Sequence, residues 1–321
     1  MATEYHGTAP GSSRRPIGSL SSAPRRNFPG MPVSAVFRTV AGLSLALIIV
    51  CSSPAPAAVQ EKPDPFARVR SRLIADGFNP EAVSQIYERS EVFLEADGVS
   101  RFFVHSEARL NYDQFSTPES IEKARAYMRE QDIPLAEAEQ TYGVDARAIT
   151  AILLVESRLG TVSGSRSALN ILSTLAALTD SGMQESFWKI IPRERRISRT
   201  HYDERVRKRA EWGYRELKAL LTYAAREQID PVAITGSYAG AVGFAQFMPT
   251  SIIAYARDGD GDGRVDLRTH ADAIASIAHY LQRHGWRPGS PREQQEKAVH
   301  AYNPSSYYVA AILKITDLLK G

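Results

Sequence analysis

Cysteine is nearly absent from this 321-residue chain, which contains only Cys51. Because a disulfide needs two cysteines, no internal disulfide is available to stabilise the fold. The seven histidines include no HExxH pair and have no cysteine partner beside them, so a zinc site is not indicated. The GxSxG segment of serine hydrolases is missing as well. What remains is a chain long enough to build a sizeable hydrophobic core from one large domain or two small ones.

An excess of positive charge is also lacking over most of the chain. The formal net charge is +3, but residues 1–57 hold five Arg and one Glu. The remainder therefore has 34 basic and 35 acidic residues. Charge gives no support to nucleic-acid binding, and we expect no nucleic-acid partner.

The apolar run at residues 40–50, VAGLSLALIIV, is too short for a membrane span. It follows Arg38 and precedes CSSPAPAA, which offers a small-residue cleavage site at Ala55 and Ala57. These are the three parts of a secretory signal. We therefore expect residues 1–57 to form an export segment and residues 58–321 the exported domain.

Two details of the export segment stay open. Residues 1–30 are rich in Ser, Pro and Gly and make a poor start to a signal, so Met31 is a plausible initiator. Cys51 could accept a lipid and anchor the protein to a membrane, although Val50 is bulkier than the residue that lipoprotein processing usually requires. We favour a soluble exported form and keep the lipid anchor as the alternative.

Helical periodicity dominates after residue 64, and no convincing run of strand alternation is present. Asn79 and Thr117 each precede a proline and an acid, which marks two helix starts. Asp145 precedes a third helix, which Gly160 is expected to close. Further helices are expected at 168–178, 203–227, 249–256, 272–284 and 305–319. No repeat or long linker divides them, so we predict one mainly α-helical domain with a helical N-terminal portion packed against it.

Glu156 is the first candidate for catalysis. Ile149, Ile152, Leu153 and Glu156 are spaced so that they share one face of a helix. A carboxylate on an apolar face is desolvated, which raises its pKa toward the range of a general acid. The alternative is a structural carboxylate paired with Arg158 or another cation at the end of the helix.

Two further segments contain candidates for ligand binding. Gly236, Gly240 and Gly243 lie in GSYAGAVGFAQFMPTS (236–251), where Gln246 offers both donors and an acceptor suited to sugar hydroxyl and acetamido groups. A tight helix-packing loop explains the glycines equally well. The segment AYNPSSYYVAA (301–311) clusters tyrosines beside an asparagine, which is typical of sugar-stacking walls but also of half-buried aromatics.

The segment RDGDGDGRVDL (257–267) is the strongest metal signal. Its aspartates and glycines match the first nine positions of an EF-hand calcium loop. Position 12, where such loops place a bidentate Glu, is Thr269, so Asp272 at the head of the next helix is the better final ligand. The expected Ca²⁺ ligands are Asp258, Asp260, Asp262, the Arg264 carbonyl, Asp266 directly or through water, and Asp272. Because sensors use paired loops and only one loop is present, we expect a structural ion.

Five segments in order resemble the membrane-bound lytic murein transglycosylase B family. They are LLVESRLG (153–160), the Gly-rich segment, the Asp-Gly loop, ADAIASIAHYLQRHGW (271–286) and AYNPSSYYVAAIL (301–313). The resemblance runs from about residue 65 to the C-terminus, and Asp272 matches the family's extended loop. It implies a lysozyme-like α-helical fold and cleavage of peptidoglycan between N-acetylmuramic acid and N-acetylglucosamine. From the export segment we expect a periplasmic protein, and we expect it to be a monomer.

The resemblance assigns Glu156 as the single catalytic acid/base. Such an enzyme protonates the glycosidic oxygen and then takes the proton from the sugar's own C6 hydroxyl, which closes a 1,6-anhydro ring. No second carboxylate is required. The substrate contacts that the resemblance implies are Ser237, Gln246, Arg209, Tyr302 and Asn303. Two departures put distal sugar sites and the loop at Asn303 in doubt: only fifteen residues separate Trp286 from Tyr302, and Pro304 follows Asn303.

Two alternative functions stay open. A muramidase-type hydrolase would use water and a second acid, for which Asp180 and Glu185 are the candidates. A calcium-dependent peptidoglycan-binding protein would have lost catalysis, and the presence of Glu156 argues against this.

Overall fold

The computed structural model describes residues 64–104 and 110–320. The predicted export segment, with Cys51 as its possible lipid acceptor, lies outside these ranges, and the expectations for it stay predictions. Within the described ranges, no helix is both long and apolar enough to cross a membrane.

Helices dominate the described residues, as the sequence predicts. The α-helices are α1 (Ala67–Ala75), α2 (Pro80–Tyr87), α3 (Ala96–Val104), α4 (Pro118–Glu130), α5 (Asp132–Tyr142), α6 (Ala146–Ser157), α7 (Ala168–Ala177), α8 (Ser181–Ile190), α9 (Arg199–Glu227), α10 (Pro249–Tyr255), α11 (His270–Arg283), α12 (Arg292–Tyr302) and α13 (Ser306–Leu318). Short 3₁₀ helices are η2 (Tyr112–Phe115), η3 (Arg193–Arg195) and η4 (Pro231–Ala233). Two short strands, β1 (Arg166–Ser167) and β2 (Thr235–Gly236), pair in antiparallel fashion.

The predicted helix starts are confirmed by their caps. The side chain of Asn79 accepts a hydrogen bond from Ala82 N at 2.8 Å, and that of Thr117 accepts one from Ser120 N at 3.2 Å. Asp145 likewise caps α6. Each cap satisfies a backbone N–H that the first helical turn leaves without a partner.

The predicted end of α6 at Gly160 is wrong by three residues. The helix ends at Ser157, and Arg158 and Leu159 both adopt left-handed backbone conformations, with φ of 49° and 60°. Leu159 N donates to Leu153 O at 2.9 Å, which closes the last turn. Glu156 is therefore the second-last residue of its helix.

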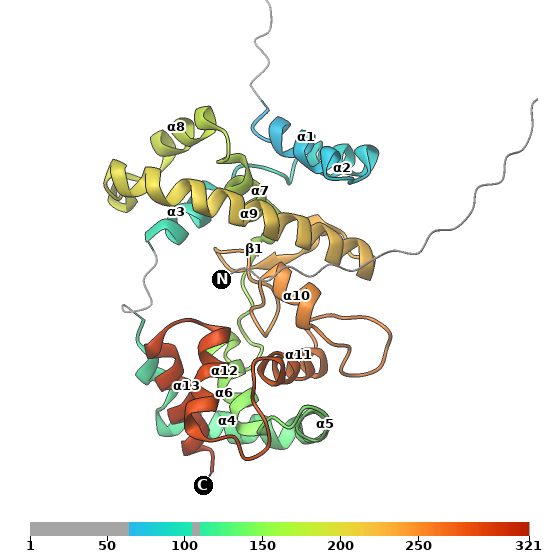
Figure 1. The fold of residues 1–321 in the computed structure, drawn as a ribbon, viewed down its shortest axis with the longest axis vertical. Coiled ribbons are helices and arrows are strands. Elements are labelled where there is room, and N and C mark those ends of the chain that lie inside the picture. Colours follow the sequence, from blue (N-terminus) through green and yellow to red (C-terminus); the bar gives the residue numbers. More distant parts are fainter. Residues whose placement is uncertain (1–63, 105–109, 321) are drawn as a thin grey trace, which may run out of the picture. The chain divides into compact units, whose positions relative to one another are not determined.

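The helices pack in two sets (Figure 1). In the first set, α7 is buried along its whole length and packs against α9, while α1 and α3 also contact α7. The predicted N-terminal helices thus pack on the main body. Gly213 permits a close approach of α9 to α7, because a Cβ there would overlap with Leu175.

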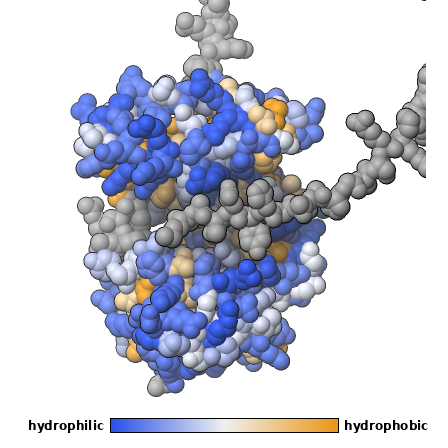
Figure 2. Space-filling view, in the orientation of Figure 1, coloured by the Kyte–Doolittle hydropathy of each residue, from blue (hydrophilic) through white to orange (hydrophobic). Residues whose placement is uncertain are grey.

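The second set is arranged around α6, which packs against α4, α5, α11 and α13 (Figure 1). The short helix α10 contacts both α9 and α11. The buried Glu216 of α9 accepts hydrogen bonds from Thr250 N and Oγ1, each at 2.9 Å, which fixes the start of α10. The visible surface of the described residues is mostly hydrophilic, with small scattered apolar patches (Figure 2).

Candidate active site

A cavity of about 460 Å³ gathers four of the predicted site residues: Glu156, Ser237, Gln246 and Asn303. They come from the end of α6, the Gly-rich segment and the end of α12. The other lining residues are Phe102, Leu110, Asn111, Tyr112, Gln114, Phe115, Val155, Tyr238, Ala239, Ala241 and Tyr308. Within the described chain, Glu156 is the only acidic residue on this wall.

The helix α6 positions Glu156 through its apolar face. Ile149, Ile152 and Leu153 are fully buried, as the spacing predicts, while Glu156 is half-buried and reaches the cavity. The core thus anchors three turns of the helix and leaves one carboxylate at its open end. A carboxylate held on a rigid element in a concave site has the placement that an acid/base group needs.

Two stacked tyrosines lie behind the Glu156 carboxylate. The rings of Tyr302 and Tyr308 are nearly parallel, with centroids 6.3 Å apart. Burial raises the pKa of both phenols well above the ordinary value, and the charge of Glu156 adds to the effect. The Glu156 carboxylate raises the pKa of Tyr308 both through its charge and through a hydrogen bond with the phenol hydroxyl. Two aromatic rings, each carrying one phenol hydroxyl, thus lie behind Glu156.

Ser237 lies in a tight turn of the Gly-rich segment. Its Oγ accepts from Ala241 N at 3.2 Å, and its own N–H donates to Ala241 O at 2.9 Å. Gly164 packs directly on this turn: a Cβ there would overlap with the Gly236 carbonyl. The close backbone approach that the glycines predict is therefore present, and it holds the Ser237 side chain at the cavity wall.

Gln246 adopts a left-handed backbone conformation, with φ of 47°. Such a conformation is costly for a side chain with a Cβ. The side chain compensates in part, because its Nε2 donates to Gly243 O at 2.8 Å and to Ser163 O at 3.2 Å. A strained residue that lines a cavity is a candidate for function.

Arg209 and Tyr302 are not among the residues that line this cavity. The Arg209 guanidinium lies 4.0 Å from the ring centroid of Phe102, which does line it, and donates to the Phe102 carbonyl oxygen. Burial lowers the pKa of Arg209 to about 10. The Tyr302 hydroxyl donates to the carbonyl of Ala245, next to Gln246. Both residues thus support the lining from behind, and direct substrate contact by either stays a prediction.

Three residues of η2, Tyr112, Gln114 and Phe115, and also Tyr238 line the cavity, and sequence reasoning did not select them. The spacing of residues in YDQF resembles no motif, and only its aromatic content hinted at a wall. Gln114 and Phe115 also line a neighbouring cavity of about 490 Å³. The two cavities therefore adjoin across this short helix.

Neither candidate for a second acid lines the Glu156 cavity. Asp180 caps α8 by accepting from Met183 N at 2.9 Å and pairs with Arg68. Glu185 pairs with Arg199 at 2.7 Å. Both carboxylates have structural partners elsewhere in the described chain.

The Asp-Gly loop brings carboxylates together between α10 and α11. Oxygen atoms of Asp258, Asp260 and Asp272 all lie within 4.8 Å of one another. Ca²⁺ binds oxygens at roughly 2.3–2.6 Å, so ligands across one ion are up to about 5 Å apart, and this donor set fits the ion. Asp272 also holds the loop closed, since its two oxygens accept from Gly259 N at 2.7 Å and Asp266 N at 2.6 Å.

The side chains of the other predicted ligands, Asp262 and Asp266, do not belong to this cluster of carboxylates. Asp262 Oδ1 accepts from Arg264 N at 2.7 Å within the loop. Asp266 Oδ1 accepts from the backbone N of Arg268 at 2.9 Å and also forms an ion pair with the Arg268 guanidinium. Their participation in metal binding stays a prediction.

The structure defines a mainly α-helical domain with a cavity on whose wall the described residues place one carboxylate, Glu156. The chain belongs to the family described as "Transglycosylase SLT domain", whose model matches residues 62–298. The resemblance found in the sequence is thereby confirmed.

Similar proteins agree with this membership. The membrane-bound lytic murein transglycosylase B of Escherichia coli K12 is 36% identical over 176 residues, which cover 55% of this chain and 41% of that protein. The soluble lytic transglycosylase SltB1 of Pseudomonas aeruginosa has a similar structure, with a TM-score of 0.65 and 25% identity over 79% of this chain and 97% of that one. The Escherichia coli lytic transglycosylase Slt35, solved in complex with calcium, has a TM-score of 0.62 and 24% identity over 81% and 93%. The chain thus spans about two fifths of the curated relative.

Proposed function

We propose that this protein is a peptidoglycan lytic transglycosylase that cleaves the MurNAc–GlcNAc β-1,4 bond and leaves 1,6-anhydromuramyl ends. The observation that carries the proposal is that, among the described residues, Glu156 alone brings a carboxylate to a cavity walled by aromatic, amide and hydroxyl groups. A retaining hydrolase would need a second carboxylate about 5 Å away. The family membership supports the same reaction class.

Glu156 would act first as the acid and then as the base. It donates a proton to the glycosidic oxygen as the bond to the leaving sugar breaks. The resulting carboxylate then accepts the proton of the muramyl C6 hydroxyl as that oxygen closes on C1. No water is consumed. Ser237, Gln246 and Asn303 would position the sugars by hydrogen bonds, and Phe102 and Tyr238 would pack against sugar rings.

Replacement of Glu156 by Gln tests this assignment. Purified peptidoglycan is digested with the wild type, Glu156→Gln and Glu185→Gln. A positioned acid/base contributes at least about 100-fold, so Glu156→Gln should lose turnover by that factor. Glu185→Gln, a matched change at a surface ion pair, should stay near wild type. Mass spectrometry of the wild-type products should give anhydromuramyl ends; reducing ends, or a loss with Glu185→Gln, would favour the muramidase alternative.

We further propose that the Asp-Gly loop binds one structural Ca²⁺. Asp258, Asp260 and Asp272 would supply carboxylate oxygens, the Arg264 carbonyl another oxygen, and Asp262 and Asp266 the remaining contacts. The calcium complex of the similar Slt35 structure supports the choice of ion. The ion would join α10 to α11 beside the segment that holds Gln246.

We also propose that the protein acts in the periplasm on peptidoglycan glycan strands, as a monomer. The predicted export signal and the murein-directed activity in the relative's name support this location. The anchoring alternative at Cys51 is tested by a Cys51→Ala variant. Release of the variant, but not the wild type, from the membrane fraction would favour a lipid anchor.

A further inference from the structure

Val265, in the outgoing half of the Asp-Gly loop, is held at both of its backbone polar groups by side chains of α9. Its N–H donates to Glu227 Oε2 at 3.0 Å, and its carbonyl oxygen accepts from the Tyr223 hydroxyl at 2.8 Å. Tyr223 is 2% exposed and Glu227 is 8% exposed. Two buried polar side chains one helical turn apart are thus committed to one loop residue.

Val265 lies at the loop position through which paired EF-hand loops contact each other. Counted from Asp258 as the first residue, Val265 is the eighth. EF-hand loops generally occur in pairs, and the eighth residue of each loop exchanges two backbone hydrogen bonds with its counterpart. The described chain has one such loop. Here the Tyr223 hydroxyl and the Glu227 carboxylate make the two hydrogen bonds to Val265 that a second loop would otherwise make.

The same contact orients the carbonyl group of Arg264. No peptide bond in the described chain is cis, and in a trans peptide the C=O and the following N–H point in opposite directions. Because the Val265 N–H points to Glu227, the Arg264 carbonyl points away from it. The Glu227 carboxylate is itself held by Arg226, whose Nε donates to Oε1 at 2.7 Å.

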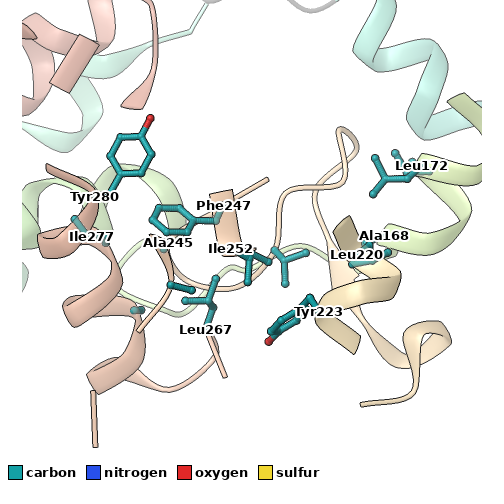
Figure 3. Close-up of a cluster of buried hydrophobic side chains, with 14 of the residues drawn as sticks. Ala168, Leu172, Leu220, Tyr223, Ala245, Phe247, Ile252, Leu267, Ile277 and Tyr280 are labelled. Atoms are coloured by element: carbon teal, nitrogen blue, oxygen red, sulfur yellow. The ribbon is translucent and has the colours of Figure 1, made fainter. Parts of the chain in front are cut away.

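The hydrogen bonds of Tyr223 and Glu227 to Val265 form a clamp on the loop. Beyond this clamp, the outgoing half of the loop also contacts the Gly-rich segment. Two residues after Val265, the Leu267 carbonyl accepts from Phe244 N at 2.7 Å. Figure 3 shows Leu267 within the buried cluster that also includes Ala245 and Ile252, with Tyr223 close by. The outgoing half of the loop is therefore anchored to α9 on one side and to the Gly-rich segment on the other.

We propose that Tyr223 and Glu227 are positioning residues that substitute for the second loop of an EF-hand pair and orient the Arg264 carbonyl for a divalent cation. The inference rests on the proposed Ca²⁺ site. A loop held in its binding geometry loses less conformational freedom when it binds. Tyr223 and Glu227 do not touch the ion, and their effect is on its affinity.

Calorimetric titration of Ca²⁺ into the metal-free protein tests this proposal. The variants are Tyr223→Phe, which removes one hydroxyl, and Glu227→Met, which removes the acceptor at similar length. Partners behind metal ligands usually contribute about 10–100-fold to affinity, so each variant should weaken Ca²⁺ binding by at least about tenfold. Glu227→Gln should restore most of the affinity, because its amide oxygen can still accept from Val265 N.

Tyr202→Phe is the matched control. Tyr202 is also a buried tyrosine of α9, and its hydroxyl donates to the Gln184 carbonyl at 2.8 Å, away from the loop. This control should keep wild-type affinity while losing similar thermal stability. If Tyr223→Phe binds Ca²⁺ as tightly as Tyr202→Phe does, the clamp proposal is overturned although the metal site stands. If the wild type binds no Ca²⁺, the metal site and the clamp both fail.

Discussion

The Tyr302 hydroxyl, at the end of α12, donates a hydrogen bond to the carbonyl oxygen of Ala245, the residue directly before Gln246. This bond joins the C-terminal tyrosine segment to the Gly-rich segment, which are more than fifty residues apart in the chain. It also places a half-buried aromatic ring near the Glu156 carboxylate. Two motifs that the sequence shows separately are therefore one structural unit behind the cavity.

Removal of this hydroxyl in Tyr302→Phe should lower both stability and turnover. The Ala245 carbonyl loses its donor, which costs about 1–3 kcal/mol when the group is buried. Peptidoglycan turnover should fall about tenfold if Gln246 shifts with the segment. Tyr280→Phe is the control, since that hydroxyl donates to Ala301 O instead. Equal turnover in the two variants would show that the Tyr302 bond does not position the site.

The strained backbone at Gln246 leads to a comparison of two substitutions. Gln246→Ala and Gln246→Gly both remove the amide, so both should lower turnover about tenfold or more. Only glycine adopts φ of 47° without strain, so Gln246→Gly should be about 1 kcal/mol more stable than Gln246→Ala. Thermal denaturation measures the difference. An alanine variant as stable as the glycine variant would show that the backbone relaxes there.

Local patterns allowed the helix that carries Glu156, and the starts of two other helices, to be predicted from the sequence, whereas α3 and α12 were missed. The caps at Asn79, Thr117 and Asp145 are hydrogen bonds between residues two or three positions apart, so the local sequence predicts them. The apolar spacing before Glu156 likewise predicted the helix face on which Glu156 lies. The two left-handed residues after Ser157 could not be foreseen, because Arg and Leu have no local preference for that conformation.

The aromatic wall of the cavity depends on long-range packing. Phe102 and Phe115 come from different elements, α3 and η2, and lie far in sequence from Gln246, which shares the cavity with them. No motif marks either residue. The supporting place of Arg209 was equally hidden, because its guanidinium stacks on Phe102 from behind. Sequence motifs predicted Glu156, Ser237, Gln246 and Asn303, whereas the aromatic residues of the cavity follow from how the helices pack.

Gly164 should be intolerant of a side chain because it packs on the Ser237 turn. Its φ is +86°, and a Cβ would overlap with the Gly236 carbonyl, which is backbone and cannot move aside cheaply. Gly164→Ala should therefore lose about 3 kcal/mol of unfolding free energy. Gly77→Ala is the matched control, with φ of +94° and open space around the new Cβ, and should lose about 1 kcal/mol. Equal losses in urea denaturation would contradict the packing argument.

The buried Glu216 should make stability depend on pH. Burial raises its pKa above the ordinary 4.5, while the two hydrogen bonds from Thr250 oppose the shift. The unfolded chain ionises first, so the contribution of Glu216 is fully present below pH 4.5 and is lost as pH rises through the raised folded pKa.

Unfolding free energies of the wild type and Glu216→Gln, measured across this range, test the sign. The wild type should lose stability relative to the variant as pH rises, and the difference should then level off. Glu119 is an exposed control whose pKa is lowered by its hydrogen bond with Lys123, so Glu119→Gln should give a shallow change of opposite sign. A constant difference between wild type and Glu216→Gln would contradict the raised pKa.

Asp272 should tie the stability of the domain to calcium. At a free Ca²⁺ concentration 100 times the dissociation constant, binding to the folded state alone adds about 2.7 kcal/mol. Chelation should therefore lower the thermal midpoint of the wild type, and Asp272→Asn should lose most of this calcium response. In chelator, the Asp272→Asn substitution should lower stability less than it does with Ca²⁺ present. Burial and the nearby Asp258 and Asp260 already disfavour the ionised Asp272 carboxylate and raise its pKa. Asp113→Asn, a surface control, should respond to calcium as the wild type does. A wild-type midpoint unchanged by chelation would overturn the stabilising role of the ion.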